Sequence, residues 1–403
     1  MAKGSQKKKA ASTSRYFDWG TVFIVLFLAA FGLVMLYSVS SFNAARKFGD
    51  GTFFVRKQAI AMAMGVIVMA VAAIVDYRLW YYASTIIYAV SLVLNVLVMF
   101  SGAGATYGGS TRWFSIGGIS FQPSETAKIA VIIFMAAQIS RIKTKDFQDF
   151  KVILKYLLMC APAVVIVAIT NLSTAIIIAG IAFMMLFVAS PKYSHFFLLA
   201  FMGVAAIAIG ILMFSYRITR IKVWLDPAAY TDGYQTLQGL YAIGSGGIFG
   251  KGLGESLQKL GYVPELENDM IFSIICEELG LVGAICIILL FVMLIWRLML
   301  IAQNANDIFG SFLAVGIMTH IALQVILNIA VVTNSFPNTG VTLPFISYGG
   351  TSITFLFMEI GIVLSVSHGI RLENLDERRS ELEGKKAVLI PINKAKVNRP
   401  DDT

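Results

Sequence analysis

Long apolar runs, separated by short polar segments, make up most of the chain. Each run is about twenty residues long, which is the length a helix needs to cross the hydrocarbon core of a bilayer. The pattern predicts about ten membrane-spanning helices, over residues 18–40, 58–75, 82–100, 123–140, 152–170, 172–189, 196–214, 269–296, 308–332 and 351–370. Only the polar pair Thr170-Asn171 separates the fifth run from the sixth, and reading the two as one long helix gives nine spans.

The composition narrows the fold class. Hydrophobic residues make up 58% of the chain and charged residues 14%, whereas a soluble domain averages about 45–50% and 25%. These values exclude a water-soluble domain, a disordered protein and a coiled coil. The unbroken apolar runs exclude a membrane β-barrel, whose strands alternate apolar and polar residues. We therefore expect an all-α polytopic membrane protein, and its first run, longer than a signal-peptide core, is interpreted as a retained span.

The distribution of charge predicts the orientation. Lys and Arg number 32 and Asp and Glu 23, a formal net charge of +9. With ten spans, both termini lie on the same side of the membrane. The segments on that side carry 20 Lys and Arg residues, against 10 in the segments on the other side. This bias predicts that both termini are cytoplasmic. The basic excess then indicates contact with anionic membrane lipid, and no nucleic acid is expected as a partner.

The chain divides into three parts. Residues 1–17 form a basic cytoplasmic tail, 18–370 form the transmembrane domain, and 371–403 form a charged cytoplasmic tail. A large outer loop, 215–268, connects the seventh and eighth spans. Its mixture of aromatic, glycine and charged residues differs from that of a linker, so we expect it to fold against the membrane face and to carry function.

Cysteines and glycines give little support to metal or nucleotide chemistry. Cys160, Cys276 and Cys286 all lie within apolar runs. An odd number without a CxxC pair argues against a disulfide framework or a zinc site. Glycine-rich stretches at 244–247 and 250–254 lack the P-loop pattern and are interpreted as tight turns and close packing.

Three outer regions combine residues that can carry chemistry, and the first precedes and opens the fourth span. It contains Arg112 beside Trp113, then Pro123, which suits the first turn of a helix. Glu125 and Lys128 are three residues apart and share a helix face. These residues form an interfacial anchor and an ion pair in one interpretation, and a binding site for an anionic headgroup in the other.

The second region leads from the outer loop into the eighth span, where Asp269 lies at the polar–apolar boundary. Aspartate at this place is typical of a helix N-cap, but a carboxylate there can also act as a base, with Glu265 and Glu267 nearby. Glu277 and Glu278 lie two turns deeper. An acidic pair inside a span is costly unless it is partnered or faces water, so we expect this helix to line a cavity.

The third region, 338–352, carries no charge but many glycine, proline and hydroxyl residues. Irregular backbone at membrane depth is tolerated only where it is buried in protein or faces a cavity. On the preceding span, His320, Gln324 and Asn328 recur every four residues. Hydrogen bonding between helices is favoured over catalysis for this stripe.

Together, these regions resemble the SEDS family (shape, elongation, division and sporulation), which includes FtsW, RodA and SpoVE. The resemblance runs from about 17 to 370, and no single motif carries it. The matching segments are Ser110-Thr111-Arg112-Trp113, Phe121-Gln122-Pro123-Ser124-Glu125, Tyr234-Gln235, Ala242-Ile243-Gly244-Ser245-Gly246-Gly247, Gly250-Lys251-Gly252-Leu253-Gly254, Gln258-Lys259, Glu277-Glu278-Leu279-Gly280 and Leu343-Pro344-Phe345-Ile346-Ser347-Tyr348-Gly349-Gly350. The segment 32–38 resembles the first helix of FtsW and SpoVE more than that of RodA.

The resemblance implies ten transmembrane helices with cytoplasmic termini, in the bacterial cytoplasmic membrane. It also implies an inverting peptidoglycan glycosyltransferase that polymerises lipid II at the outer face during cell division or elongation. Asp269 matches the family's catalytic aspartate, and Arg112 and Lys128 match basic positions that matter for substrate. Two features depart from the family. Glu267-Asn268 stand where a Thr, often with a His before it, is usual, and the segment 170–175 lacks an acid that the family carries.

On this basis Asp269 is the candidate general base, acting on the acceptor hydroxyl. The leaving group is a pyrophosphate and needs positive charge around it. Further substrate-binding candidates are Arg112, Lys128, Glu125, Arg217, Arg220, Gln258, Lys259 and Ser347. No cofactor is demanded, although a divalent cation (Mg or Mn) would suit the pyrophosphate.

The resemblance also implies partners: a class B penicillin-binding protein that supplies the transpeptidase, other division or elongation proteins, and membrane lipid. The sequence contains no penicillin-binding Ser-x-x-Lys domain, so crosslinking is expected to come from elsewhere. Two other functions stay open: a lipid II flippase, and a division scaffold without enzymatic activity. Polymer formation in detergent, where no transport can occur, separates the enzyme from the flippase.

Overall fold

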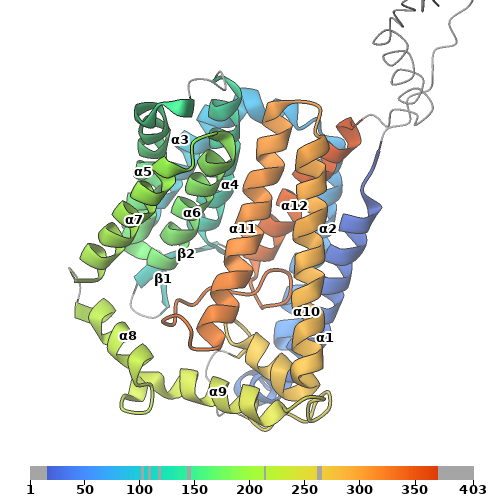
Figure 1. The fold of residues 1–403 in the computed structure, drawn as a ribbon. Coiled ribbons are helices and arrows are strands. Elements are labelled where there is room, and N and C mark those ends of the chain that lie inside the picture. The colour runs from blue at the N-terminus through green and yellow to red at the C-terminus, as the bar shows by residue number, and fades with distance from the viewer. Residues whose placement is uncertain are drawn as a thin grey trace, which may run out of the picture.

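The computed structural model describes residues 16–100, 104–107, 110–116, 119–142, 147–212, 215–260 and 266–370. Within them, every predicted span coincides with one long helix (Figure 1). These helices are α1 (Trp19–Phe48), α2 (Phe53–Ile74), α3 (Arg78–Phe100), α4 (Pro123–Ser140), α5 (Phe150–Thr170), α6 (Leu172–Ala189), α7 (Ser194–Leu212), α10 (Ile271–Asn304), α11 (Ile308–Val332) and α12 (Thr351–Gly369).

The outer surface of the bundle is apolar, as lipid requires. Large side chains such as Ile74, Phe100 and Phe197 are 85%, 81% and 79% exposed. Eight of the helices in the described residues are long and apolar enough to cross a membrane. The prediction of a helical, multi-pass membrane fold is thereby confirmed. That α4 and α7 also cross, for a total of ten spans, stays a prediction.

The fifth and sixth apolar runs form two helices, so the alternative of one long helix is wrong. Asn171 ends α5 in an extended conformation (φ −147°, ψ 92°) and caps α6. Its side-chain oxygen accepts a hydrogen bond from the Thr174 backbone N–H at 3.2 Å. Asparagine is a favoured N-cap because this bond satisfies one of the free amides at a helix start.

Both ends of the membrane body lie on the same side. The Tyr16 N–H donates to the Ile370 carbonyl at 3.1 Å, and the buried Asp18 pairs with Arg297 at 2.6 Å. The outer loop forms α8 (Ser215–Leu225), a short 3-10 turn (Thr231–Gly233) and α9 (Tyr234–Gly246), which lie across the opposite end of the bundle (Figure 1). The expected tails, 1–17 and 371–403, fall almost entirely outside the described residues.

A small antiparallel sheet, which the apolar pattern did not predict, precedes α4. Its strands β1 (Gly104–Tyr107), β2 (Ser110–Ile116) and β3 (Ile119–Phe121) pair in the order β1-β2-β3. The register shifts between Ala105 and Thr106, so Arg112 is the extra residue on β2 at this bulge. Bulges bend a strand and redirect a side chain.

α4 is the most enclosed helix of the bundle. It packs against α3, α6 and α11, and almost all of its residues are buried, including Ser124, Glu125 and Lys128 in its first turns. A polar helix start is thus held inside the protein, next to the outer end of the bundle. This placement brings α4 close to the start of α12, where Ser352 donates a hydrogen bond to Glu125.

Candidate active site

Asp269 lies two residues before α10 begins and is 5% exposed. The cap position of α10 is Met270, not Asp269, and it makes no side-chain capping bond. The interpretation of Asp269 as the N-cap is therefore wrong. The residues that follow it, Ile271 and Phe272, are buried in the core. Their burial fixes the start of the helix and with it the position of the Asp269 backbone.

The Asp269 carboxylate accepts a hydrogen bond from a neutral side-chain amide. Gln235 of α9 donates from Nε2 to its Oδ1 at 3.3 Å. Asn338 in turn donates from Nδ2 to the Gln235 Oε1 at 3.1 Å, and the exposed Arg220 of α8 donates to the Asn338 carbonyl at 3.0 Å. The chain of contacts thus links the predicted residue Arg220 to Asp269 through two residues from separate segments.

The polar stripe on α11 holds the backbone around this site. Asn328 donates to the carbonyls of Asp269 (2.8 Å) and Val341 (2.7 Å), and Gln324 donates to the Thr342 carbonyl at 3.0 Å. The stripe was expected to bond other helices. Here these two amides bond irregular backbone, which satisfies carbonyl groups that no helix or sheet pairs.

The segment between α11 and α12 closes on itself and on the outer loop. The Ser347 Oγ accepts from the Leu343 N–H at 2.9 Å, and the Ser347 carbonyl accepts from Gln58 of α2 at 3.1 Å. The Tyr348 N–H donates to the Glu267 carbonyl at 2.8 Å, two residues before Asp269. In this structure Ser347 therefore shapes a turn, while its role in binding substrate stays a prediction.

Glu125 and Lys128 form a buried ion pair on α4, as one of the two interpretations predicts. The Lys128 Nζ lies 3.0 Å from Glu125 Oε2, and the Lys128 side chain is 3% exposed. Ser352 of α12 donates to the same carboxylate at 2.8 Å. A second buried pair, His320 Nδ1 with Glu359 Oε2 at 2.7 Å, joins α11 to α12.

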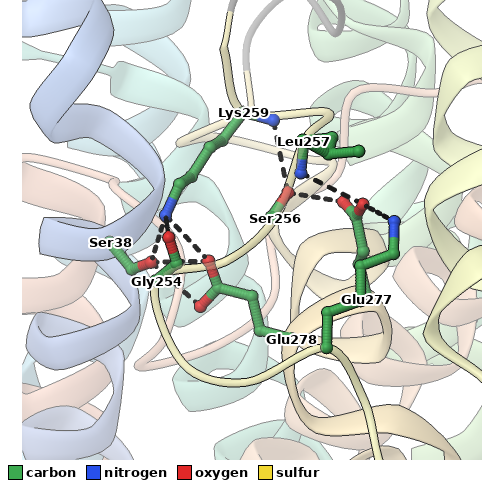
Figure 2. A network of polar contacts seen from close by, with 8 residues as sticks. Ser38, Gly254, Ser256, Leu257, Lys259, Glu277 and Glu278 are labelled. Atoms are coloured by element: carbon green, nitrogen blue, oxygen red, sulfur yellow. Dashed lines mark hydrogen bonds and ion pairs between the residues drawn. The ribbon is translucent and has the colours of Figure 1, made fainter.

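Glu277 and Glu278 of α10 are both buried and both bound by lysines of the outer loop (Figure 2). Lys251 lies 2.6 Å from Glu277 Oε1, and Ser256 and the Leu257 N–H also donate to that carboxylate. We name these contacts, together with those of Lys259, the lysine latch.

The second half of the latch joins three segments. The Lys259 Nζ lies 3.2 Å from Glu278 Oε1 and 3.3 Å from the Ser38 Oγ of α1, and it also donates to the Gly254 carbonyl. Ser38 itself donates to Glu278 at 2.7 Å. Lys259 is thus occupied by a buried carboxylate in this structure, which does not favour its predicted contact with a pyrophosphate.

The backbone of α10 is broken beside the latch. Gly280 has φ +69° inside the helix. The Lys251 and Gly252 N–H groups donate to the carbonyls of Glu277 and Glu278, and the Leu281 N–H donates to the Gly247 carbonyl at 3.0 Å. The outer loop thus supplies the hydrogen bonds that the helix loses. A side chain at Gly280 would collide with the Gly250 amide.

The remaining predicted residues lie partly outside the described structure. The backbone of Arg112 is on β2 and that of Arg217 is on α8, but their side chains lie outside the described residues. Gln258 is half-buried, and within the described residues its Oε1 accepts no hydrogen bond. Apolar patterning did not single out Asn338 or Ser38 as site residues, because their importance depends on segments far away in sequence.

The family profile described as "Cell cycle protein" (FTSW_RODA_SPOVE) matches residues 19–372. This chain belongs to the FtsW/RodA/SpoVE family. It is 41% identical to the Stage V sporulation protein E of Bacillus subtilis (strain 168) over 358 residues, which cover 86% of this chain and 95% of that protein. It is 38% identical to the "Probable peptidoglycan glycosyltransferase FtsW" of Trichlorobacter lovleyi over 372 residues, covering 89% and 95%.

Solved structures of the family share the fold. A chain from "Structural coordination of polymerization and crosslinking by a peptidoglycan synthase complex" superposes with a TM-score of 0.73 at 25% identity, covering 87% of this chain and 97% of that one. The RodA protein of Thermus thermophilus superposes with a TM-score of 0.66 at 24% identity, covering 89% and 98%. The resemblance seen in the sequence is thereby confirmed.

Proposed function

We propose that this protein is a peptidoglycan glycosyltransferase that polymerises lipid II at the outer face of the cytoplasmic membrane, with Asp269 as general base. Relatives that match nearly the whole chain are named as probable peptidoglycan glycosyltransferases. The observation that carries the mechanism is the buried Asp269 at the outer end of the bundle, whose carboxylate accepts a hydrogen bond from Gln235 of α9 and whose backbone carbonyl accepts one from Asn328 of α11.

The reaction requires a base for the acceptor hydroxyl and positive charge near the leaving pyrophosphate. The base takes the proton of the acceptor sugar hydroxyl as that oxygen attacks the anomeric carbon, and the polyprenyl pyrophosphate leaves with the bonding electron pair. Attack from the side opposite the leaving group inverts the anomeric configuration. Arg112, Arg217 and Arg220 are the proposed contacts for the developing charge on pyrophosphate. The buried Lys128 adds positive charge from α4, balanced by Glu125.

We also propose that any divalent cation arrives with the substrate. Among the described residues there is no group of three or more His, Cys, Asp or Glu side chains that could hold a metal ion. Magnesium is commonly bound by one or two carboxylates together with substrate phosphates. Such an ion would therefore take most of its ligands from the pyrophosphate and from water rather than from protein side chains.

The partner is proposed to be a class B penicillin-binding protein that crosslinks the new strands. One related structure belongs to a peptidoglycan synthase complex whose description names polymerisation and crosslinking together. The lateral surface of the bundle is apolar and exposed, so it offers area for a partner's transmembrane helix as well as for lipid.

The test compares purified wild-type protein with Asp269→Asn in detergent, using lipid II as substrate. Wild type is expected to form glycan polymer, and Asp269→Asn is expected to lose at least about a hundredfold in rate. The amide has nearly the same shape but cannot take the proton. Normal polymerisation by the variant would overturn the assignment of the base, and a wild type that moves lipid II across vesicles without polymerising it would indicate a flippase. A scaffold would tolerate Asp269→Asn in cells.

A further inference from the structure

We propose that Gln235 is a positioning residue for Asp269, and that Asn338 determines which end of the Gln235 amide faces the carboxylate. This inference rests on the proposed function, because it assigns the groups that orient the base. The two residues come from α9 and from the segment after α11, which are about a hundred residues apart in the chain.

The orientation of the Asn338 and Gln235 amides follows from one backbone N–H group, which can act only as a hydrogen-bond donor. The Gly340 backbone N–H donates to the Asn338 side chain at 3.1 Å. A backbone N–H can only donate, so the atom that it meets is the Asn338 oxygen, and the other end of that amide is the NH₂ group. This NH₂ donates to Gln235 at 3.1 Å, which makes the receiving atom the Gln235 oxygen. The NH₂ of Gln235 is left to face Asp269 Oδ1 at 3.3 Å.

We call the contacts from Gly340 through Asn338 to Gln235 the relay. The relay fixes which end of the Gln235 amide faces Asp269, an orientation that a glutamine side chain by itself leaves open. Without Asn338, the Gln235 amide could turn and present its oxygen to the carboxylate, where two acceptors would repel. With Asn338 in place, a donor always faces Asp269. Gly340 has φ +66°, and a Cβ built on it would be 3.9 Å from Asp269 Oδ2, so the same turn that starts the relay lies beside the carboxylate.

A neutral donor suits a base better than a lysine does. A hydrogen bond to a carboxylate favours its charged form modestly, whereas a buried cation at contact distance favours it strongly and weakens the carboxylate as a proton acceptor. Gln235 therefore holds the carboxylate in a fixed direction without adding positive charge of its own beside it. Orientation of this kind affects kcat more than the binding of substrate.

The experiment compares Gln235→Glu with Gln235→Ala in the full-length chain, under the conditions in which wild type polymerises lipid II. The Glu variant keeps the shape of the side chain and its bond from Asn338, but it points an oxygen at Asp269. We expect kcat to fall about tenfold to a hundredfold in both variants with KM changed less than threefold. The acid limb of the pH–rate profile is expected to move upward by roughly one pH unit in Gln235→Ala, and further in Gln235→Glu, because two adjacent carboxylates share a proton.

Two further variants make the result decisive. Asn338→Asp keeps the bond from Gly340 but removes the donor to Gln235, so it should reproduce the loss in kcat without touching Asp269. Gln238→Glu adds the same charge three residues along α9 and serves as the matched control, with activity expected to stay within about twofold of wild type. Thermal melting in detergent identifies any variant that fails to fold.

The outcomes distinguish the positioning role of Gln235 from the assignment of Asp269 as the base. A Gln235→Glu variant as active as wild type, or a pH profile unmoved in every variant, would overturn the positioning role while leaving Asp269 as base. A folded Asp269→Asn variant with normal polymerisation would instead overturn the base assignment itself. A role in filling space alone predicts that Gln235→Ala is impaired and Gln235→Glu is not.

Discussion

Three acidic residues on the same segment of chain are contacted by different kinds of donor. Asp269, just before α10, contacts the neutral amide of Gln235. Glu277 and Glu278, two turns into the helix, contact the ammonium groups of Lys251 and Lys259 (Figure 2). All three carboxylates are buried. Asp269 is thus contacted by a neutral donor, whereas Glu277 and Glu278 are contacted by the lysines that hold the outer loop to the membrane body.

The comparison also shows how a membrane helix can carry two acids at little cost. An unpaired charge at this depth is expensive, but the outer loop brings one lysine to each glutamate. The same loop donates backbone hydrogen bonds to the broken helix at Gly280. The loop and the first turns of α10 therefore form one unit, and Asp269 lies at the outer end of that unit.

The largest predicted effect on stability is at Glu278. Replacing it by Leu leaves the ammonium group of Lys259, whose side chain is 11% exposed, buried without its charge partner. We expect a loss of about 3–5 kcal/mol in the free energy of unfolding. Titration with a denaturing detergent, followed by circular dichroism, measures it.

A double variant tests whether this loss comes from the stranded charge. Glu278→Leu combined with Lys259→Met should recover most of the stability, because no buried charge is left alone. Glu255→Gln, an exposed acid in the same loop, is the matched control and should change stability by less than about 0.5 kcal/mol. If the double variant is no more stable than the single one, the latch does not act as a charge pair.

The next effect concerns the break in α10. Gly280→Ala requires a positive φ from a residue with a Cβ and places that atom against the Gly250 amide. We expect a loss of about 2–4 kcal/mol and faster proteolysis of the loop 250–259. Gly244→Ala is the control, because a Cβ there meets open space. Equal proteolysis of the two variants would contradict the role of the break in seating the loop.

The smallest predicted effect on stability is at Asp269. Because asparagine has nearly the same size and its oxygen can still accept the hydrogen bond from Gln235, we expect Asp269→Asn to change the melting temperature by less than about 3 °C. Together with the loss of polymerisation, this result would separate activity from stability at one residue. A destabilisation as large as that of Glu278→Leu would mean that the two kinds of carboxylate do not differ as proposed.

The candidate site was predictable in part. Asp269, Glu125 and Lys128 stand out in sequence because charged residues are rare in and beside apolar runs. Arg220 also reaches the site, through Asn338. Lys259 was predicted to bind substrate, yet the fold directs it to Glu278. The sequence pattern could not distinguish a substrate-binding lysine from a structural one, because a lysine in a loop looks the same in sequence whether it contacts a phosphate or a carboxylate.

The sequence by itself determined the helices and the membrane class. In lipid each backbone group must be bonded within its own helix, so a run of apolar residues is enough to specify a span. The tertiary structure alone decided the pairing of the polar groups. The carboxylates are reached from other segments of the chain by Gln235, Lys251 and Lys259. Hydrogen bonds act only over about 3 Å and in fixed directions. Which acid receives an amide and which a lysine thus depends on how the helices and the outer loop pack.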